Sequence, residues 1–205
     1  RALIDVFGLT DAPRFAGLLA ALSPQTSVES NAINALNTWT NWIKAGRPTD
    51  PKKITAILGR SVMGEKGAGS ILDAWKNNTI AALSAPDAQA ITLSGPKVSA
   101  FMKNLQGITN EVTNDTWMAN FANIDQTVFK GTWNTKAKRN EVSPGYTAMA
   151  AMTRQAAEAA TKITGEEWTP AEIQETVWSW TKALYEMREK AGEERTAAEI
   201  VAAGG

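Results

Sequence analysis

The chain has 205 residues, its 21 Lys and Arg are balanced by 21 Asp and Glu, and it contains neither Cys nor His. Without Cys it cannot form disulfides, thiol nucleophiles or iron–sulfur clusters, and without His it cannot build a Ser-His-Asp triad or the usual zinc sites. Any catalysis must therefore use carboxylates, lysines, tyrosines or hydroxyl groups.

The neutral total is unevenly distributed along the chain. Residues 158–205 carry ten acidic and five basic residues, so the remainder of the chain has an excess of bases. Two basic runs lie in that remainder, over residues 44–66 and 130–139. They are either solvated loops or a surface that faces phosphate groups, and both interpretations stay open.

Apolar residues recur at helical spacing along most of the chain, and no run of alternating β-branched residues predicts a sheet. The pattern predicts helices over residues 27–45, 51–58, 70–82, 86–91, 96–105, 115–121 and 146–162, a long helix from 170, and a last one within 196–205. A polar connector is expected over 124–143. The fold class that we expect is all-α, with about nine or ten helices.

Capping signals mark the start of two of these helices. Asp50-Pro51 combines an N-cap acceptor with proline at the first helical position. Thr169-Pro170-Ala171-Glu172 adds the glutamate of a capping box to the same pattern. The expected core face of the helix that follows consists of Ile173, Val177, Trp180, Leu184 and Met187.

The stretch with the most chemical content lies near the middle of the chain. Ile91-Thr92-Leu93-Ser94-Gly95-Pro96-Lys97 predicts a tight turn between two helices, and Asn114-Asp115-Thr116-Trp117 starts a further helix after an extended piece. Backbone N–H groups at a helix start can bind a phosphate. Because Lys97 and Asp115 are eighteen residues apart, a returning loop could bring them into one cleft.

These segments resemble the helix–hairpin–helix (HhH-GPD) DNA glycosylase superfamily, of the endonuclease III and 8-oxoguanine glycosylase kind. In that family the hairpin reads Leu-Pro-Gly-Val-Gly-x-Lys, and an essential Asp follows in a Val-Asp-Thr-His-like segment. Leu22-Ser23-Pro24-Gln25-Thr26 is similar to a further family segment, Leu-Ser-x-Gln-Thr. The resemblance covers roughly residues 20–125.

The chain departs from the family pattern at several positions. Leu93 replaces the first hairpin glycine, Pro96 lacks a backbone N–H, and Trp117 stands in place of the histidine. The C-terminal 60 residues match no cellular repair enzyme, and they look like uncharacterised small bacteriophage proteins. A divergent, phage-encoded member of the superfamily is the interpretation that this favours.

The resemblance implies a two-lobed fold with a cleft, in which residues 24–130 form the core domain and 1–23 plus 131–205 the second lobe. It implies a base-excision enzyme that flips a modified or damaged base out of duplex DNA and cleaves its N-glycosidic bond. Asp115 would stabilise the cationic sugar, and Lys97 would be the Schiff-base nucleophile if the enzyme is also an abasic-site lyase.

Further residues are expected to contact the DNA. Gln25 would fill the space left by the flipped base, and Met63 would act as a wedge in the stack. The other expected contacts are Ser94, Gly95, Lys130, Lys136, Lys138 and Arg139. We expect a monomer that uses neither a metal ion nor a cofactor. No apolar stretch approaches the roughly 18–20 residues of a membrane span, so we expect a cytoplasmic protein, in the host if phage-encoded.

Each assignment has a structural alternative. Asp115 could simply cap the helix that follows it, Lys97 could be a surface charge, and the tryptophans at 39, 42, 178 and 180 could serve packing alone. Three other functions stay open: a base-hypermodification enzyme on the same fold, a non-catalytic module that binds DNA or a protein, and a helical protein without a nucleic-acid role.

Overall fold

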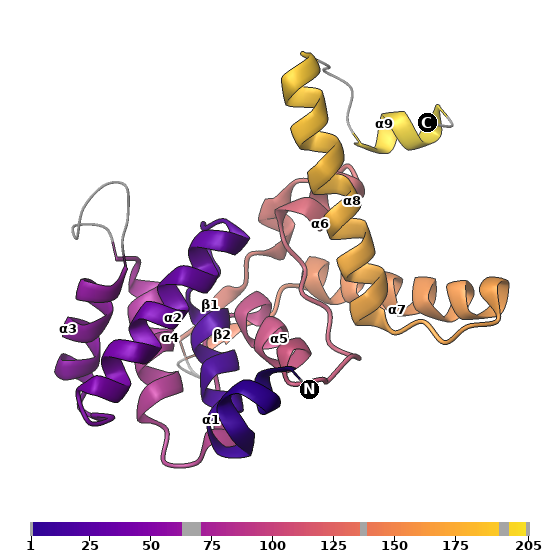
Figure 1. Cartoon of the computed structure of the whole chain (residues 1–205). Helices are drawn as coiled ribbons and strands as arrows, with labels where there is room; N and C mark the ends of the chain where they lie inside the picture. Colours follow the sequence, from indigo (N-terminus) through magenta and orange to yellow (C-terminus); the bar gives the residue numbers. More distant parts are fainter. Residues whose placement is uncertain (1, 63–70, 136–138, 193–196, 204–205) are drawn as a thin grey trace. The chain divides into compact units, whose positions relative to one another are not determined.

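The computed structural model describes residues 2–62, 71–135, 139–192 and 197–203, and within these ranges the fold is helical apart from one short strand pair (Figure 1). The all-α fold class is confirmed. The helices are α1 (Ala2–Ala21), α2 (Val28–Lys44), α3 (Pro51–Ser61), α4 (Asp73–Ser84), α5 (Pro96–Leu105), α6 (Thr116–Phe121), α7 (Pro144–Thr164), α8 (Pro170–Ala191) and α9 (Ala197–Ala202), with 3₁₀ turns η1 (Ala88–Ala90) and η2 (Gln126–Phe129). None of them, in the part of the chain that the structure describes, is long and apolar enough to cross a membrane.

The chain divides into two compact units. The first unit comprises Arg1–Ser94 with Phe101–Gly107, and the second comprises Gly95–Ala100 with Ile108–Gly205. This division differs from the predicted lobes, because residues 1–23 belong with the helices that follow them rather than with the C-terminal part. The physical reason is the buried face of α1, which packs on α4 and α2.

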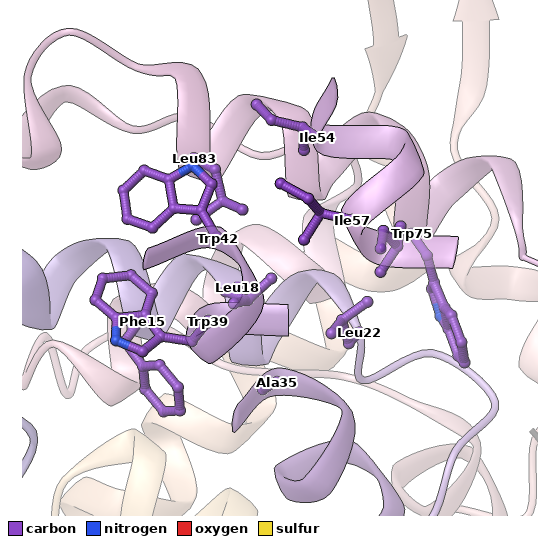
Figure 2. Packing of buried hydrophobic residues seen from close by; sticks show 11 residues of the cluster. Phe15, Leu18, Leu22, Ala35, Trp39, Trp42, Ile54, Ile57, Trp75 and Leu83 are labelled. Carbon is purple, nitrogen blue, oxygen red and sulfur yellow. The ribbon is translucent and has the colours of Figure 1, made fainter. Parts of the chain in front are cut away.

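Helices α1 to α4 build the core of the first unit, which Figure 2 shows in close-up. Phe15 stacks on Phe7 with ring centroids 4.0 Å apart, and the Trp39 ring meets both rings edge-on. Trp42 packs against Trp39, and its indole N–H donates to Pro48 O at 2.9 Å. Trp39, Trp42 and Trp75 all belong to this core, so three of the eight tryptophans have a structural role here.

Helix α1 has no counterpart among the predicted helices. Its buried residues include the nearly continuous run Ala12–Leu18, so no single apolar stripe marks it in the sequence. Gly8 breaks it with a φ of 75°, and Pro13 lies inside it. The elements predicted at 27–45, 96–105 and 115–121 agree with α2, α5 and α6 to within a residue at each end.

The second unit is built around a smaller core beneath α6 and α7. Its buried residues are Met118, Ala119, Phe129, Tyr146 and Met149, with Ala122 and Val177 packed against them. Ser143 caps α7 by accepting from Tyr146 N, and its hydroxyl also donates to Val128 O at 2.7 Å. The predicted capping box at the start of α8 is confirmed, since Thr169 and Glu172 bond each other's backbone N–H.

The core face predicted for α8 is wrong in part. Trp180 is 37% exposed and Met187 is 61% exposed, whereas Gln174 and Thr181 are buried. The buried face of α8 therefore differs from the predicted one and includes polar residues. Thr181 can be buried because its hydroxyl donates to Val177 O at 2.7 Å.

Two other segments differ from the sequence prediction. Residues 86–91 form only the single 3₁₀ turn η1, with Asp87 as its cap, instead of a helix. The connector over 124–143 contains η2 and an antiparallel pair, β1 (Thr132–Asn134) and β2 (Arg139–Glu141). A single 3₁₀ turn therefore stands before α5, where the sequence predicts the first helix of a hairpin.

The start of α7 approaches η2 so closely that only glycine fits. A Cβ added to Gly145 would lie 2.6 Å from Val128 O. We expect Gly145→Ala to lower the free energy of unfolding by about 1–3 kcal/mol, since backbone must move to admit the methyl group. Chemical denaturation followed by circular dichroism measures this.

Gly59→Ala is the matched control. Gly59 lies inside α3, and an added Cβ there meets only Ile71 Cδ1 at 3.5 Å. Its stability should stay equal or rise by up to ~1 kcal/mol, because alanine favours the helix. If Gly145→Ala behaved in the same way, the close approach of α7 and η2 would be refuted.

Candidate active site

A pocket of about 410 Å³ lies within the second unit. Its wall combines the first turn of α5, the loop that enters α6, the η2 region and Tyr146 of α7. Lys97, Asp115 and Lys130 are the charged side chains among its lining residues. Pockets of roughly 300–1,000 Å³ with a few convergent polar groups are typical small-molecule sites.

Asp115 is the N-cap of α6, and its carboxylate is almost completely buried, with 9% of the side chain exposed. One oxygen, Oδ1, accepts from the backbone N–H of Trp117 at 3.0 Å and of Met118 at 3.4 Å. The other, Oδ2, accepts from the indole N–H of Trp178 at 3.0 Å. These donors compensate the loss of solvent around the carboxylate.

Lys97 meets Asp115 across the pocket wall. Its Nζ lies 3.3 Å from Asp115 Oδ2, and 38% of its side chain remains exposed. The helix α5 delivers this lysine from its first turn, directly after Gly95, which has a φ of 98°. The structure therefore brings the predicted lysine and aspartate together at one pocket.

Tyr146 holds the loop that delivers Asp115. Its hydroxyl donates to Val112 O at 2.7 Å and accepts from Asn114 N at 3.2 Å. Burial raises the pKa of Tyr146 to about 12; the hydrogen bond from Asn114 lowers it, and the charges of Glu111 and Asp115 raise it. The phenol consequently stays neutral at physiological pH and acts as a clamp.

Asn114 is a second buried polar group in the same wall. Its Nδ2 donates to Tyr146 O at 3.0 Å, whereas its Oδ1 meets no hydrogen-bond partner among the described residues. Only 2% of Asn114 is exposed. An acceptor left without a donor in this environment costs free energy.

Glu175 adds a further carboxylate near Asp115. It lies on α8 three residues before Trp178. Burial raises the pKa of Glu175, a hydrogen bond with Ser179 lowers it, and the charge of Asp115 raises it.

The remaining predicted site residues are distributed over both units. In the first unit Gln25 is exposed with a φ of 57°, and Ser94 bonds the Asn78 side chain through both its N–H and its carbonyl. In the second unit Lys130 is exposed at the pocket, and the backbone of Arg139 lies in β2. Met63, Lys136 and Lys138 lie outside the described residues.

Sequence reasoning missed three of the residues that build this site. Tyr146 and Asn114 carry no motif that marks them, because their hydrogen bonds join positions more than thirty residues apart. Trp178 was interpreted as packing, yet its indole is bonded to Asp115 across 63 positions. The one local signal near Tyr146 is the N-cap Ser143. It predicts the start of α7, but not the hydrogen bonds that the Tyr146 hydroxyl makes.

The chain belongs to DUF7178, a family of unknown function whose model matches residues 9–184. The matched range includes every lining residue of the pocket as well as Trp178. Searches of curated proteins and of solved structures find no match.

The raised pKa of Tyr146 predicts a specific alkaline loss of stability. Because the phenol is harder to ionise in the folded chain than in the unfolded one, its contribution is complete below about pH 10 and is lost as the pH rises toward 12. Relative to Tyr146→Phe, the native protein should lose up to roughly 2–3 kcal/mol of unfolding free energy across this interval.

Denaturation curves of the two proteins at pH 8, 10 and 12 measure this difference. Tyr185→Phe is the control, since it removes the hydroxyl of a tyrosine that is 42% exposed. Equal slopes for the native protein and Tyr146→Phe would show that the hydroxyl is not buried in solution.

Proposed function

We propose that this DUF7178 chain is a DNA glycosylase-like enzyme that flips a modified or damaged base out of duplex DNA and cleaves its N-glycosidic bond. The observation that carries the proposal is the Lys97–Asp115 pair at the wall of the pocket, at 3.3 Å. This chemistry requires a carboxylate, and an amine only where a lyase step follows, so neither His nor Cys is needed.

The reaction uses the buried carboxylate as an electrostatic stabiliser. When the bond between the base nitrogen and the sugar C1′ breaks, its electron pair leaves with the base and positive charge develops on the sugar. Asp115 is held rigidly by its cap and by Trp178, so it stabilises that charge with little reorganisation. Water supplies the nucleophile in the hydrolytic branch, and its released proton neutralises the departing base or passes to solvent.

In the lyase branch Lys97 takes the place of water. Its ammonium first loses a proton to solvent, after which the nitrogen forms a bond to C1′ as the base leaves with the electron pair of the broken bond and takes up a proton from water. The nitrogen then gives up a proton and the ring oxygen O4′ gains one as the sugar ring opens. This leaves a protonated imine between Lys97 and C1′, which borohydride reduces to a stable amine.

The proposal includes the two-lobed helix–hairpin–helix fold, with Ser94-Gly95 as the turn before α5. It also includes duplex DNA as the partner, and action as a monomer in the cytoplasm, of the host if phage-encoded.

A non-catalytic DNA-binding module is the second candidate. Asp115 is a complete N-cap, and a cap needs no chemistry to explain its position. Pro96 supports this alternative, because it removes one N–H from the turn of α5 that would face a phosphate.

Asp115→Asn separates the two candidates. Asparagine caps a helix about as well as aspartate, so the fold should persist while the negative charge is lost. We expect base release to fall at least ~100-fold with duplex binding largely retained. Release is measured as alkali-labile abasic sites in duplexes that carry uracil, oxidised, alkylated or hydroxymethylated bases.

Asp50→Asn is the matched control, because Asp50 is also an N-cap and is not among the residues that line the pocket. It should release base at the native rate. If the native protein releases no base from any of these duplexes but binds them in a salt-dependent way, the enzyme is refuted and the binding module remains.

The role of Lys97 is tested by trapping. Borohydride added during turnover should link the native chain to the DNA, and Lys97→Arg should abolish the adduct because a guanidinium forms no imine. Arginine preserves the positive charge beside Asp115, which keeps the pocket intact. Lys103→Arg, on the same helix, is the control, and undiminished trapping by Lys97→Arg would remove Lys97 from the covalent step.

A further inference from the structure

Helix α8 reaches the candidate active site through one side chain. Trp178 donates its indole N–H to Asp115 Oδ2 at 3.0 Å, and the same oxygen lies 3.3 Å from Lys97 Nζ. Asp115 Oδ2 therefore has two donors, the Trp178 indole and the Lys97 ammonium. The other oxygen, Oδ1, is committed to the backbone of α6.

We propose that Trp178 is a positioning residue for Asp115, which fixes Oδ2 at the pocket wall so that the carboxylate does not collapse onto Lys97. This inference rests on the proposed function. It extends the reacting site to α8, beyond the part of the chain that resembles the glycosylases.

The geometry at Asp115 explains why an additional donor matters. The cap holds Oδ1 by one bond of 3.0 Å and one of 3.4 Å, which leaves the carboxylate some freedom to turn about its own axis. With Lys97 as the sole donor to Oδ2, the oxygen would follow a flexible ammonium. The indole N–H is fixed on a rigid ring. A hydrogen bond to it therefore holds Oδ2 in one orientation.

The indole is itself held on α8. Lys182 Nζ lies 5.7 Å from the centre of the Trp178 ring and is paired with Glu186 at 2.9 Å. Helix α8 also packs directly on α6, the helix that Asp115 caps. The donor and its acceptor are thus anchored in adjoining helices of the same unit.

Trp178→Phe removes the N–H and keeps an aromatic ring. We expect kcat for base release to fall on the order of 10- to 100-fold while KM changes less than twofold, because the carboxylate is misplaced but the pocket is not. Trp178→His retains a ring N–H and should restore part of the loss. Trp180→Phe is the control, since Trp180 packs edge-on against Phe121 and does not contact Asp115.

An indole spectrum tests the contact without reference to activity. In ¹H–¹⁵N spectra of the whole chain, Asp115→Asn should shift the Trp178 indole signal, assigned with Trp178→Phe or Trp178→His, and leave the Trp180 signal in place. An unmoved Trp178 signal would overturn the inference, even if Trp178→Phe did not fold.

The kinetic outcomes distinguish the inference from the proposed function. If the native chain releases base and Trp178→Phe matches Trp180→Phe in kcat, Trp178 has no positioning role and the proposed function stands. If kcat and KM change together in Trp178→Phe, the residue shapes the pocket and the inference is also overturned. If the native chain releases no base from any duplex, the proposed function fails, and the inference fails with it.

Discussion

The buried carboxylate of Asp115 is the interaction on which the second unit depends. Donors reach it from three helices: the α6 backbone, Lys97 of α5 and Trp178 of α8. A carboxylate that is 9% exposed is stable only when such donors surround it. The carboxylate thus joins the first turn of α5 and the middle of α8 to the start of α6. The pocket lies beside this arrangement, with Lys97 and Asp115 in its wall.

Tyr146 gives this arrangement its rigidity. The phenol binds both Val112 O and Asn114 N, so the loop before Asp115 is fixed at two backbone positions. The ring belongs to the core beneath α6 and α7, and the neighbouring Gly145 allows α7 to approach Val128. The core around Tyr146, the loop that its hydroxyl binds and the carboxylate of Asp115 are thus connected by continuous contacts. A site preorganised in this way spends little free energy on rearrangement when a ligand enters.

Local signals account for what could be predicted, and long-range contacts account for what could not. Asp50 and Thr169 allow the starts of α3 and α8 to be predicted, because an N-cap involves only the next three residues. Lys97 and Asp115 could be paired because their spacing resembles a known motif. Trp178 could not be assigned, since its bond to Asp115 is fixed by how α8 packs on α6. Helix α1 was missed because its nearly continuous buried run shows no helical period.

The structural and the catalytic interpretations of Asp115 do not exclude each other. A cap explains the two bonds to Oδ1, yet it requires nothing of Oδ2, where Lys97 and Trp178 meet. A purely structural aspartate also gives no reason for a pocket beside it. An ion pair whose lysine side chain is 38% exposed adds little to the stability of a fold. The function that we propose would give the arrangement at Oδ2 a role that capping α6 does not.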